Sequence, residues 1–246
     1  MRSPSFWSYI KNDKYRVGCT GQTVYVYSSD GTELAQFKDL KYAYHAAFSP
    51  KGDIFAVKTT DGRLGIYSLS TLSLIKKFRF SKIKGSQDDN FCFSPDGQLL
   101  FNIERQKKDY ISVLSVYSTD DFNLVTSYFE EDNDLALSTI EYGSATGEYF
   151  ILGFERPDTS ELFSDIRRFV ARFSNGTLCD KIYITGNEYA FYYWYKECEA
   201  CGFTKKSLQW SELPIQGYDV ENLEKRKFSL EGLWTYYREK ETKGVF

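Results

Sequence analysis

The residue pair most suggestive of chemistry in this sequence is Cys198-x-x-Cys201, in the segment "KECEACGF". Two cysteines at this spacing suit zinc coordination or thiol–disulfide exchange. A structural zinc needs four ligands, but the chain has no second pair of this kind, and its single histidine, His45, is distant in sequence. Cys198 and Cys201 are therefore only weak candidates for a metal site, and we expect no cofactor.

The acidic residues gather in runs where turns and loops are expected. These runs are Asp88-Asp89, Asp120-Asp121 and "FEEDND" from Phe129 to Asp134. Glycoside hydrolysis needs two carboxyl groups on either side of one bond, whereas runs of like charge in loops are usually solvated. One histidine gives no basis for a Ser–His–Asp arrangement, and no phosphate-binding glycine loop is visible. The sequence predicts a protein that is not an enzyme and has no catalytic residue.

A basic run with interleaved aromatics, "IKKFRFSKIKG", has the composition of a site for single-stranded nucleic acid. Its cationic residues are Lys76, Lys77, Arg79, Lys82 and Lys84. Lysine also protects exposed sheet edges against pairing with other chains, and "LEKRKF" places a second such cluster later in the sequence. The chain carries 31 basic and 34 acidic residues, a net charge of −3, so its overall charge does not favour nucleic acid. We therefore expect an edge strand at this run.

The segment "NEYAFYYWYKE", residues 187–197, concentrates aromatic side chains. In a strand, alternate residues face opposite sides, so such a segment could be buried on both faces inside a stack of sheets. The functional alternative is an aromatic platform for a sugar or a peptide, because Tyr and Trp are enriched at binding hot spots. Both interpretations require a strand here.

The segments expected to position these residues contain an internal sequence repeat. "AFSPKGDIFAV" at residues 47–57 recurs as "CFSPDGQLLFN" at residues 92–102. Ser49-Pro50-Lys51-Gly52 and Ser94-Pro95-Asp96-Gly97 both suit a type I turn, since Pro presets the second position and Gly the fourth. Apolar stretches flank each turn, so each unit predicts a β-hairpin.

Aromatic residues extend the repeat along the chain. Tyr27, Tyr67, Tyr117, Phe173 and Tyr218 each end an expected strand, at spacings of 40, 50, 56 and 45 residues. A second aromatic follows each of them after 10 to 12 residues: Phe37, Phe78, Phe129, Tyr183 and Phe228. The intervening turns include Asp30-Gly31 and Asn175-Gly176, which favour tight hairpins. A period near this length, with four strands per unit, is typical of a β-propeller.

Residues 42–129 resemble WD-repeat propeller blades, with a Ser-Pro-x-Gly turn, a second strand, an Asp-Gly turn and a third strand in order. The family's Trp-Asp pair is replaced, for example by Tyr67-Ser68, and only Tyr218-Asp219 keeps the aspartate. The family's Gly-His pair is absent. The resemblance therefore implies degenerate blades without the family's His–Asp hydrogen-bond network.

The expected architecture is all-β: a single β-propeller domain over residues 1–246 with about five four-stranded blades. The blades are expected at about 4–40, 41–80, 88–130, 136–184 and 189–230, with 231–246 as a tail or a closing strand. An open or truncated propeller is one alternative. A β-sandwich with coincidentally similar hairpins is another.

The resemblance implies a protein-interaction or scaffold module that binds a protein partner. The alternatives are a lectin-like carbohydrate-binding propeller, which needs exposed aromatics in successive blades, and a degenerate five-bladed glycoside-processing enzyme, which needs carboxylates converging in a channel. No apolar run approaches the ~20 residues of a membrane helix, and the N-terminus lacks the apolar core of a secretory signal. Five cysteines, an odd number, favour a reducing cytoplasm over a disulfide framework.

Overall fold

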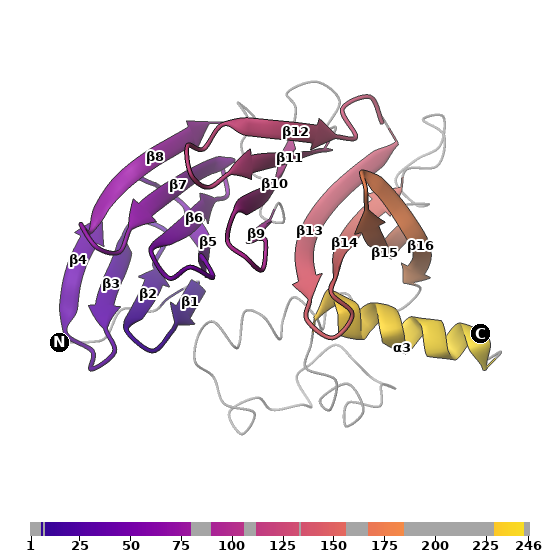
Figure 1. Ribbon diagram of the computed structural model, residues 1–246, viewed down its shortest axis with the longest axis horizontal. Coiled ribbons are helices and arrows are strands. Elements are labelled where there is room, and N and C mark those ends of the chain that lie inside the picture. Colours follow the sequence, from indigo (N-terminus) through magenta and orange to yellow (C-terminus); the bar gives the residue numbers. More distant parts are fainter. Residues whose placement is uncertain are drawn as a thin grey trace.

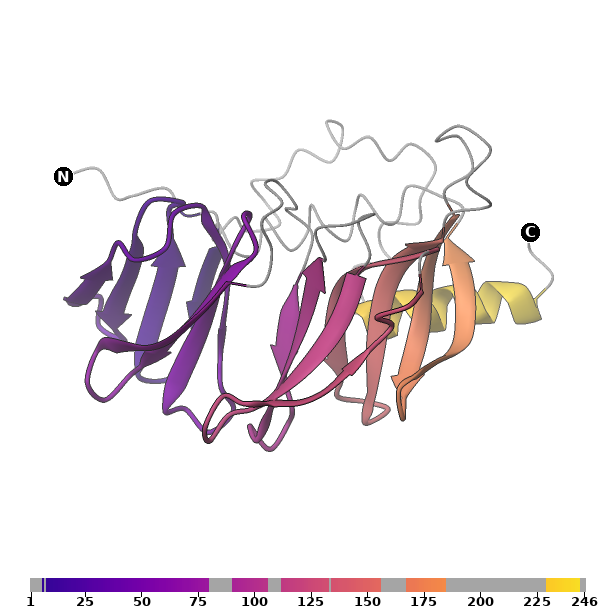
Figure 2. The same cartoon turned by 90° about the horizontal axis from the view of Figure 1, so that it is seen from above.

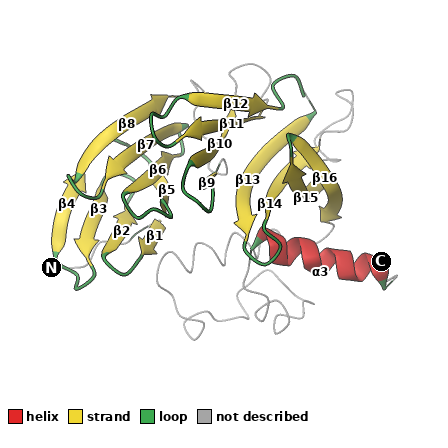
Figure 3. Cartoon of the chain, in the orientation of Figure 1, coloured by secondary structure: helices red, strands yellow, loops and turns green. Residues whose placement is uncertain are grey.

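The computed structural model describes residues 6, 8–79, 90–105, 112–132, 134–155, 167–184 and 229–243. Within these ranges the chain forms four antiparallel sheets, each made of four strands that are consecutive in sequence. Figure 3 shows these strands in yellow and the described helix in red. The expected all-β class is confirmed.

The first sheet contains β1 (Ser8–Lys11), β2 (Tyr15–Cys19), β3 (Val24–Ser28) and β4 (Glu33–Phe37). The second contains β5 (Ala43–Phe48), β6 (Ile54–Thr59), β7 (Arg63–Ser68) and β8 (Ser73–Arg79). The third contains β9 (Phe91–Phe93), β10 (Leu99–Arg105), β11 (Ser112–Ser118) and β12 (Leu124–Tyr128). The fourth contains β13 (Leu135–Gly143), β14 (Glu148–Glu155), β15 (Arg167–Ser174) and β16 (Thr177–Ile184).

The sheets follow one another along an arc (Figure 1), and strands of successive sheets stand side by side in the view from above (Figure 2). β1, β5 and β9 lie on the concave side of the arc, and β4, β8 and β12 lie on its convex side (Figure 1). Four-stranded sheets arranged in sequence order are the blades of a propeller. We therefore number these sheets as blades 1 to 4. Five blades are not confirmed, because the expected fifth falls almost wholly on residues 185–228, outside the described ranges.

The repeated turns adopt the predicted hairpins. Gly52 N donates to Ser49 O at 2.9 Å between β5 and β6, and Gly97 N donates to Ser94 O at 2.8 Å between β9 and β10. Both glycines have positive φ, 72° and 68°, a conformation that costs glycine little. The Ser-Pro-x-Gly repeat therefore forms the inner hairpins of two neighbouring blades.

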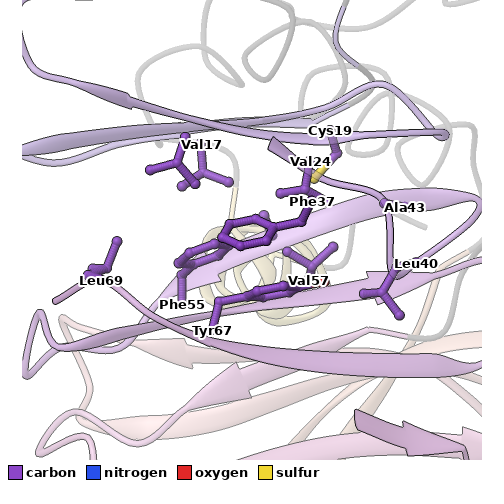
Figure 4. Packing of buried hydrophobic residues seen from close by; sticks show 12 residues of the cluster. Val17, Cys19, Val24, Phe37, Leu40, Ala43, Phe55, Val57, Tyr67 and Leu69 are labelled. Atoms are coloured by element: carbon purple, nitrogen blue, oxygen red, sulfur yellow. The ribbon is translucent and has the colours of Figure 1, made fainter. Parts of the chain in front are cut away.

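Apolar side chains fill the space between successive blades. β6 is buried along its whole length: Phe55 and Val57 pack toward blade 1, whereas Ile54 and Ala56 pack toward blade 3. Figure 4 shows the cluster between blades 1 and 2, where the Phe55 and Tyr67 rings stack with centroids 5.0 Å apart. Alternation along a strand thus gives each inner blade two buried faces.

A helix, α3 (Leu230–Thr242), covers the face of blade 4 that points away from blade 3. The Ser229 side chain caps its start by accepting a 3.0 Å hydrogen bond from Gly232 N. The closing strand considered for residues 231–246 does not form over the described part of that segment. The buried residues Leu230, Leu233 and Tyr237 explain this, because spacings of three and four place them on one side of a helix.

Candidate functional site: charged groups at one end of the blades

The contacts between blades become polar at one end of the strands, which we call the upper end. It is the end where β6, β10 and β14 finish and β7, β11 and β15 begin. Between blades 2 and 3, the face carrying Ile54 and Ala56 continues with Lys58 as the strand alternates. The opposing face of blade 3 continues from Leu100 to Asn102 and Glu104. A charged group thus replaces the apolar packing near the upper end.

Lys58 is only 1% exposed, so its ammonium group needs partners inside the protein. Its Nζ donates to Asn102 Oδ1 at 2.8 Å and to the backbone oxygen of Ile103. Asn102 Nδ2 in turn donates to Glu104 Oε1 at 3.2 Å. These bonds join the second strands of two blades through a buried polar chain.

Glu104 ends this chain, and its carboxylate also accepts a 2.7 Å hydrogen bond from the Tyr117 hydroxyl. Burial raises the pKa of Glu104, while the hydrogen bonds from Tyr117 and Asn102 and the charge of Lys58 act in the opposite direction with a smaller effect. The hydroxyl of Tyr117 also has a raised pKa, first because of burial and then because of Glu104. Lys58, Asn102 and Tyr117 are buried and Glu104 is partly buried, so we assign the cluster a structural role.

The corresponding place between blades 3 and 4 is open. A cavity of about 310 Å³ lies there. Its walls come from the segment after β12, from all four strands of blade 4 and from the turn between β15 and β16: Phe129, Asp132, Asp134, Leu135, Glu155, Arg167, Gly176, Thr177, Leu178 and Lys181. A second hollow shares Phe129, Asp132 and Asp134 and adds Ser127, Glu130 and Glu131. We call the two together the blade 3–4 groove.

Glu155 forms ion pairs with two cationic residues of the groove wall, Arg167 and Lys181. Its carboxylate accepts hydrogen bonds from Lys181 Nζ and, at 2.6 Å, from the Tyr183 hydroxyl. The Arg167 guanidinium lies 3.9 Å from the same carboxylate and above the Tyr183 ring, 4.9 Å from its centroid. Burial alone would raise the pKa of Glu155, but the hydrogen bonds and the two cations together lower it. Glu155 therefore stays ionised and holds both cations of the groove wall.

Among the described residues that line the groove, the remaining charge is negative. Arg167 and Lys181 both face Glu155, whereas Glu130, Glu131, Asp132 and Asp134 add four further carboxylates. A concave surface with an excess of one charge attracts ligands of the opposite charge and helps to orient them. The groove is suited to a cationic group.

The acidic segment from Phe129 to Asp134 was expected to be a solvated connection, and the described part of it does connect β12 to β13. Its position in the wall of a groove could not be read from the sequence. The Asp120-Asp121 run lies at the opposite end of blade 3, where Asp121 Oδ1 accepts a 3.0 Å hydrogen bond from Asn123 N in the turn. Asp88 and Asp89 lie outside the described residues.

The basic run begins on β8, the outer edge strand of blade 2, as predicted. Lys77 Nζ donates to Asp39 O at 2.6 Å, and Lys76 lies 5.7 Å from the centre of the Phe78 ring. Both lysines thus contact their own blade or the connection before it. Lys82 and Lys84 lie outside the described residues.

Three further features of the sequence analysis also fall outside the described ranges. They are the Cys198–Cys201 pair, the aromatic segment 187–197 and the second basic cluster. His45 is described: it lies on β5 with its ring edge-on to Phe91 of blade 3, at a centroid distance of 4.9 Å. This contact uses the histidine for packing between inner strands.

The Lys58–Glu104 cluster was not anticipated. The signal available was a lysine inside the otherwise apolar strand sequence "IFAVKT". Cys19 is buried, and burial raises the pKa of its thiol to about 12, which leaves it unreactive at neutral pH. Cys92 and Cys179 are partly exposed. In the part of the chain that the structure describes, no helix has the length and apolarity to cross a membrane.

Comparison with known proteins supports the fold. The sequence matches no family model and no curated protein. The WD40 domain of Toxoplasma gondii coronin aligns with a TM-score of 0.54 and 17% identity, over 72% of this chain and 45% of that one. Kuenenia stuttgartiensis hydrazine synthase aligns with a TM-score of 0.52 and 11% identity, over 66% of this chain and 49% of that one.

The chain thus spans about half the length of these two solved structures. At such low identity the likeness concerns the fold and not the activity of either protein. Four four-stranded antiparallel blades in sequence order agree with it. The protein has a WD-repeat-like β-propeller fold.

Proposed function

We propose that the protein is a non-catalytic interaction module that binds a basic segment of a partner protein in the blade 3–4 groove. The observation that carries the proposal is the charge of this groove. Glu155 engages Arg167 and Lys181, and Glu130, Glu131, Asp132 and Asp134 add carboxylates that no other described lining residue of the groove neutralises. Lysine or arginine side chains of a partner would complement that surface.

Two observations favour this proposal over the alternatives. A lectin-like propeller needs exposed aromatics in successive blades. Tyr67 and Tyr117, the repeated aromatics that end the third strands of blades 2 and 3, are only 0% and 7% exposed. A glycoside-processing site needs at least two converging carboxylates. The described inner strands β1, β5, β9 and β13 together carry a single acidic residue, Glu141. Its carboxylate accepts a 2.9 Å hydrogen bond from Leu230 N of α3.

The test compares protein capture by matched variants. Asp132→Asn with Asp134→Asn neutralises the groove, and Asp120→Asn with Asp121→Asn removes the same charge from the opposite end of the third blade. The wild type and the control pair are expected to retain the same protein from an extract of the native host, and the groove pair to lose it. Equal capture by all three contradicts the proposal, and retention on a sugar column without a protein partner favours the lectin alternative.

A cytoplasmic location is part of the same proposal, and its support is the odd number of cysteines. Fractionation of native cells with an antibody against the chain tests it. Recovery in an oxidising compartment would contradict it.

A further inference from the structure

The convex side of the arc is made of sheet edges with different chemistry. Among the described residues, β4, β8, β12 and β16 are the outer strands of their blades. β4 carries Glu33, β8 carries Lys76 and Lys77, and β16 carries Asp180 and Lys181. β12, with the sequence LVTSY, carries no charge. Charged residues on an edge prevent pairing with another chain, so β12 lacks the protection that the other three have.

β12 also exposes the largest apolar fractions among the described large hydrophobic residues. Leu124 is 56% exposed and Val125 is 59% exposed. Val125 is the extra residue of a β-bulge, because the β11–β12 pairing passes from Tyr117↔Leu124 to Val116↔Thr126. Leu34 of β4 and Ile75 of β8 are the extra residues of equivalent bulges, so the outer strands of blades 1, 2 and 3 share this bulge.

A bulge disrupts the ladder locally and limits pairing at that part of an edge. Beyond the bulge, Thr126, Ser127 and Tyr128 pair in regular register with Val116, Ser115 and Leu114. Within the described chain these three residues have no strand on their other side. The uncharged edge thus remains available over its last three residues.

This edge leads directly into the blade 3–4 groove. Phe129 follows Tyr128 with a positive φ of 68°, and the acidic run then begins at Glu130. Ser127, on the edge itself, lines the same hollow as Glu130 and donates a hydrogen bond to it. A chain paired with β12 would therefore continue into a negatively charged pocket.

We propose that the partner segment binds in extended form, as a fifth strand beside β12, with its lysine or arginine residues in the blade 3–4 groove. The inference rests on the proposed function, since it specifies the shape of the basic segment. Backbone hydrogen bonds to Thr126–Tyr128 would supply affinity, as in other cases of strand addition, and the acidic run would select the charge. Leu124 and Val125 offer apolar contacts at the other end of the segment.

The test uses a synthetic peptide, Lys-Lys-Val-Thr-Val-Thr-Val, and the same peptide with N-methyl groups on its valines. The methyl groups remove main-chain donors and leave the charges in place. Fluorescence polarisation is expected to show binding of the first peptide and at least about tenfold weaker binding of the second, because each lost hydrogen bond weakens binding several-fold. The double variant Leu124→Lys with Val125→Lys is expected to weaken binding of the unmodified peptide by a similar factor. Ile75→Lys on β8 is expected to leave that binding unchanged.

Equal binding of the two peptides, lost in the Asp132→Asn with Asp134→Asn variant, overturns strand addition and leaves a charged groove that binds basic segments. Absence of binding by the unmodified peptide also overturns strand addition, while the capture experiment still decides the proposed function. Self-association of the wild type that Leu124→Lys abolishes would identify a second copy of the chain as the occupant and would overturn the inference.

Discussion

Lys58 of blade 2 donates a hydrogen bond of 2.8 Å to the side chain of Asn102 in blade 3, at a site that solvent hardly reaches. The buried core of this interface is otherwise apolar and aromatic. An exposed ion pair between Lys51 and Asp120, at 3.5 Å, joins the two blades at their other end. A buried ammonium group is stable only while its partners are present, because removal from water costs several kcal/mol. The bond therefore makes the two blades depend on each other's polar residues.

Replacing Lys58 with methionine should destabilise the protein by about 2–4 kcal/mol, because Glu104 and Asn102 would lose their buried cation. Chemical denaturation measures the change. Adding Glu104→Gln to the same chain should restore part of the loss, since no buried charge then remains uncompensated. The exposed lysine of β8 provides the control: Lys77→Met should cost less than about 1 kcal/mol. Equal losses for the two lysines would contradict the structural role of Lys58.

The ion pairs of Glu155 predict a loss of stability in acid. Its carboxyl group has a pKa below the ordinary 4.5, so near that pH it binds fewer protons in the folded than in the unfolded chain. Its contribution to the free energy of unfolding is complete above pH 4.5 and disappears as the pH falls through the lowered value. Urea unfolding between about pH 6 and pH 3 measures this, and Glu155→Gln should flatten the decline. Parallel curves for the two proteins would contradict it.

Glu104 should behave in the opposite way. Burial raises its pKa above 4.5, so the folded chain binds the proton more tightly than the unfolded chain does. Its contribution is complete below pH 4.5 and falls as the pH rises through the raised value. Glu104→Gln should remove this decline from the stability profile. A profile that keeps its slope in the variant would show that another group is responsible.

Gly153→Ala should destabilise blade 4 by about 1–3 kcal/mol through overpacking. A Cβ at this position would lie 2.6 Å from Cζ of Phe169 and 3.0 Å from the backbone oxygen of Ala136. Thermal unfolding measures the effect. The double variant Gly153→Ala with Phe169→Leu should lose less than the sum of the two single changes, because the shorter side chain makes room. Strict additivity would show that the two residues do not contact each other.

The α3–blade 4 contact is tested at Trp234. Its indole nitrogen donates to Asp180 O at 2.9 Å, and its ring packs against Phe150 at 5.8 Å between centroids. Trp234→Phe should cost about 1 kcal/mol through the lost hydrogen bond, and Trp234→Ala about 2–4 kcal/mol through the lost packing as well. Guanidinium unfolding gives both values. Similar small losses for both variants would mean that α3 adds little to the stability of blade 4.

The sequence predicted the parts of the structure that depend on neighbouring residues. Ser49-Pro50 and Ser94-Pro95 predicted two hairpins because turn geometry is set within four residues. Lys58 and Asn102 are 44 residues apart, and their contact exists only once two blades pack together. The groove around Glu155 depends on packing in the same way. The helical spacing of Leu230, Leu233 and Tyr237 is visible in the sequence, but the face that these residues cover is not.

The strand order has a consequence for how the protein folds. Every described ladder joins strands that are consecutive in sequence, so the hydrogen bonds of each blade close within a stretch of about 30 to 50 residues. Short loop closures cost little entropy and speed folding. The ladders of one blade can therefore form from nearby chain. Each inner blade buries apolar side chains on both faces, so contacts such as Lys58–Asn102 form as successive blades pack together.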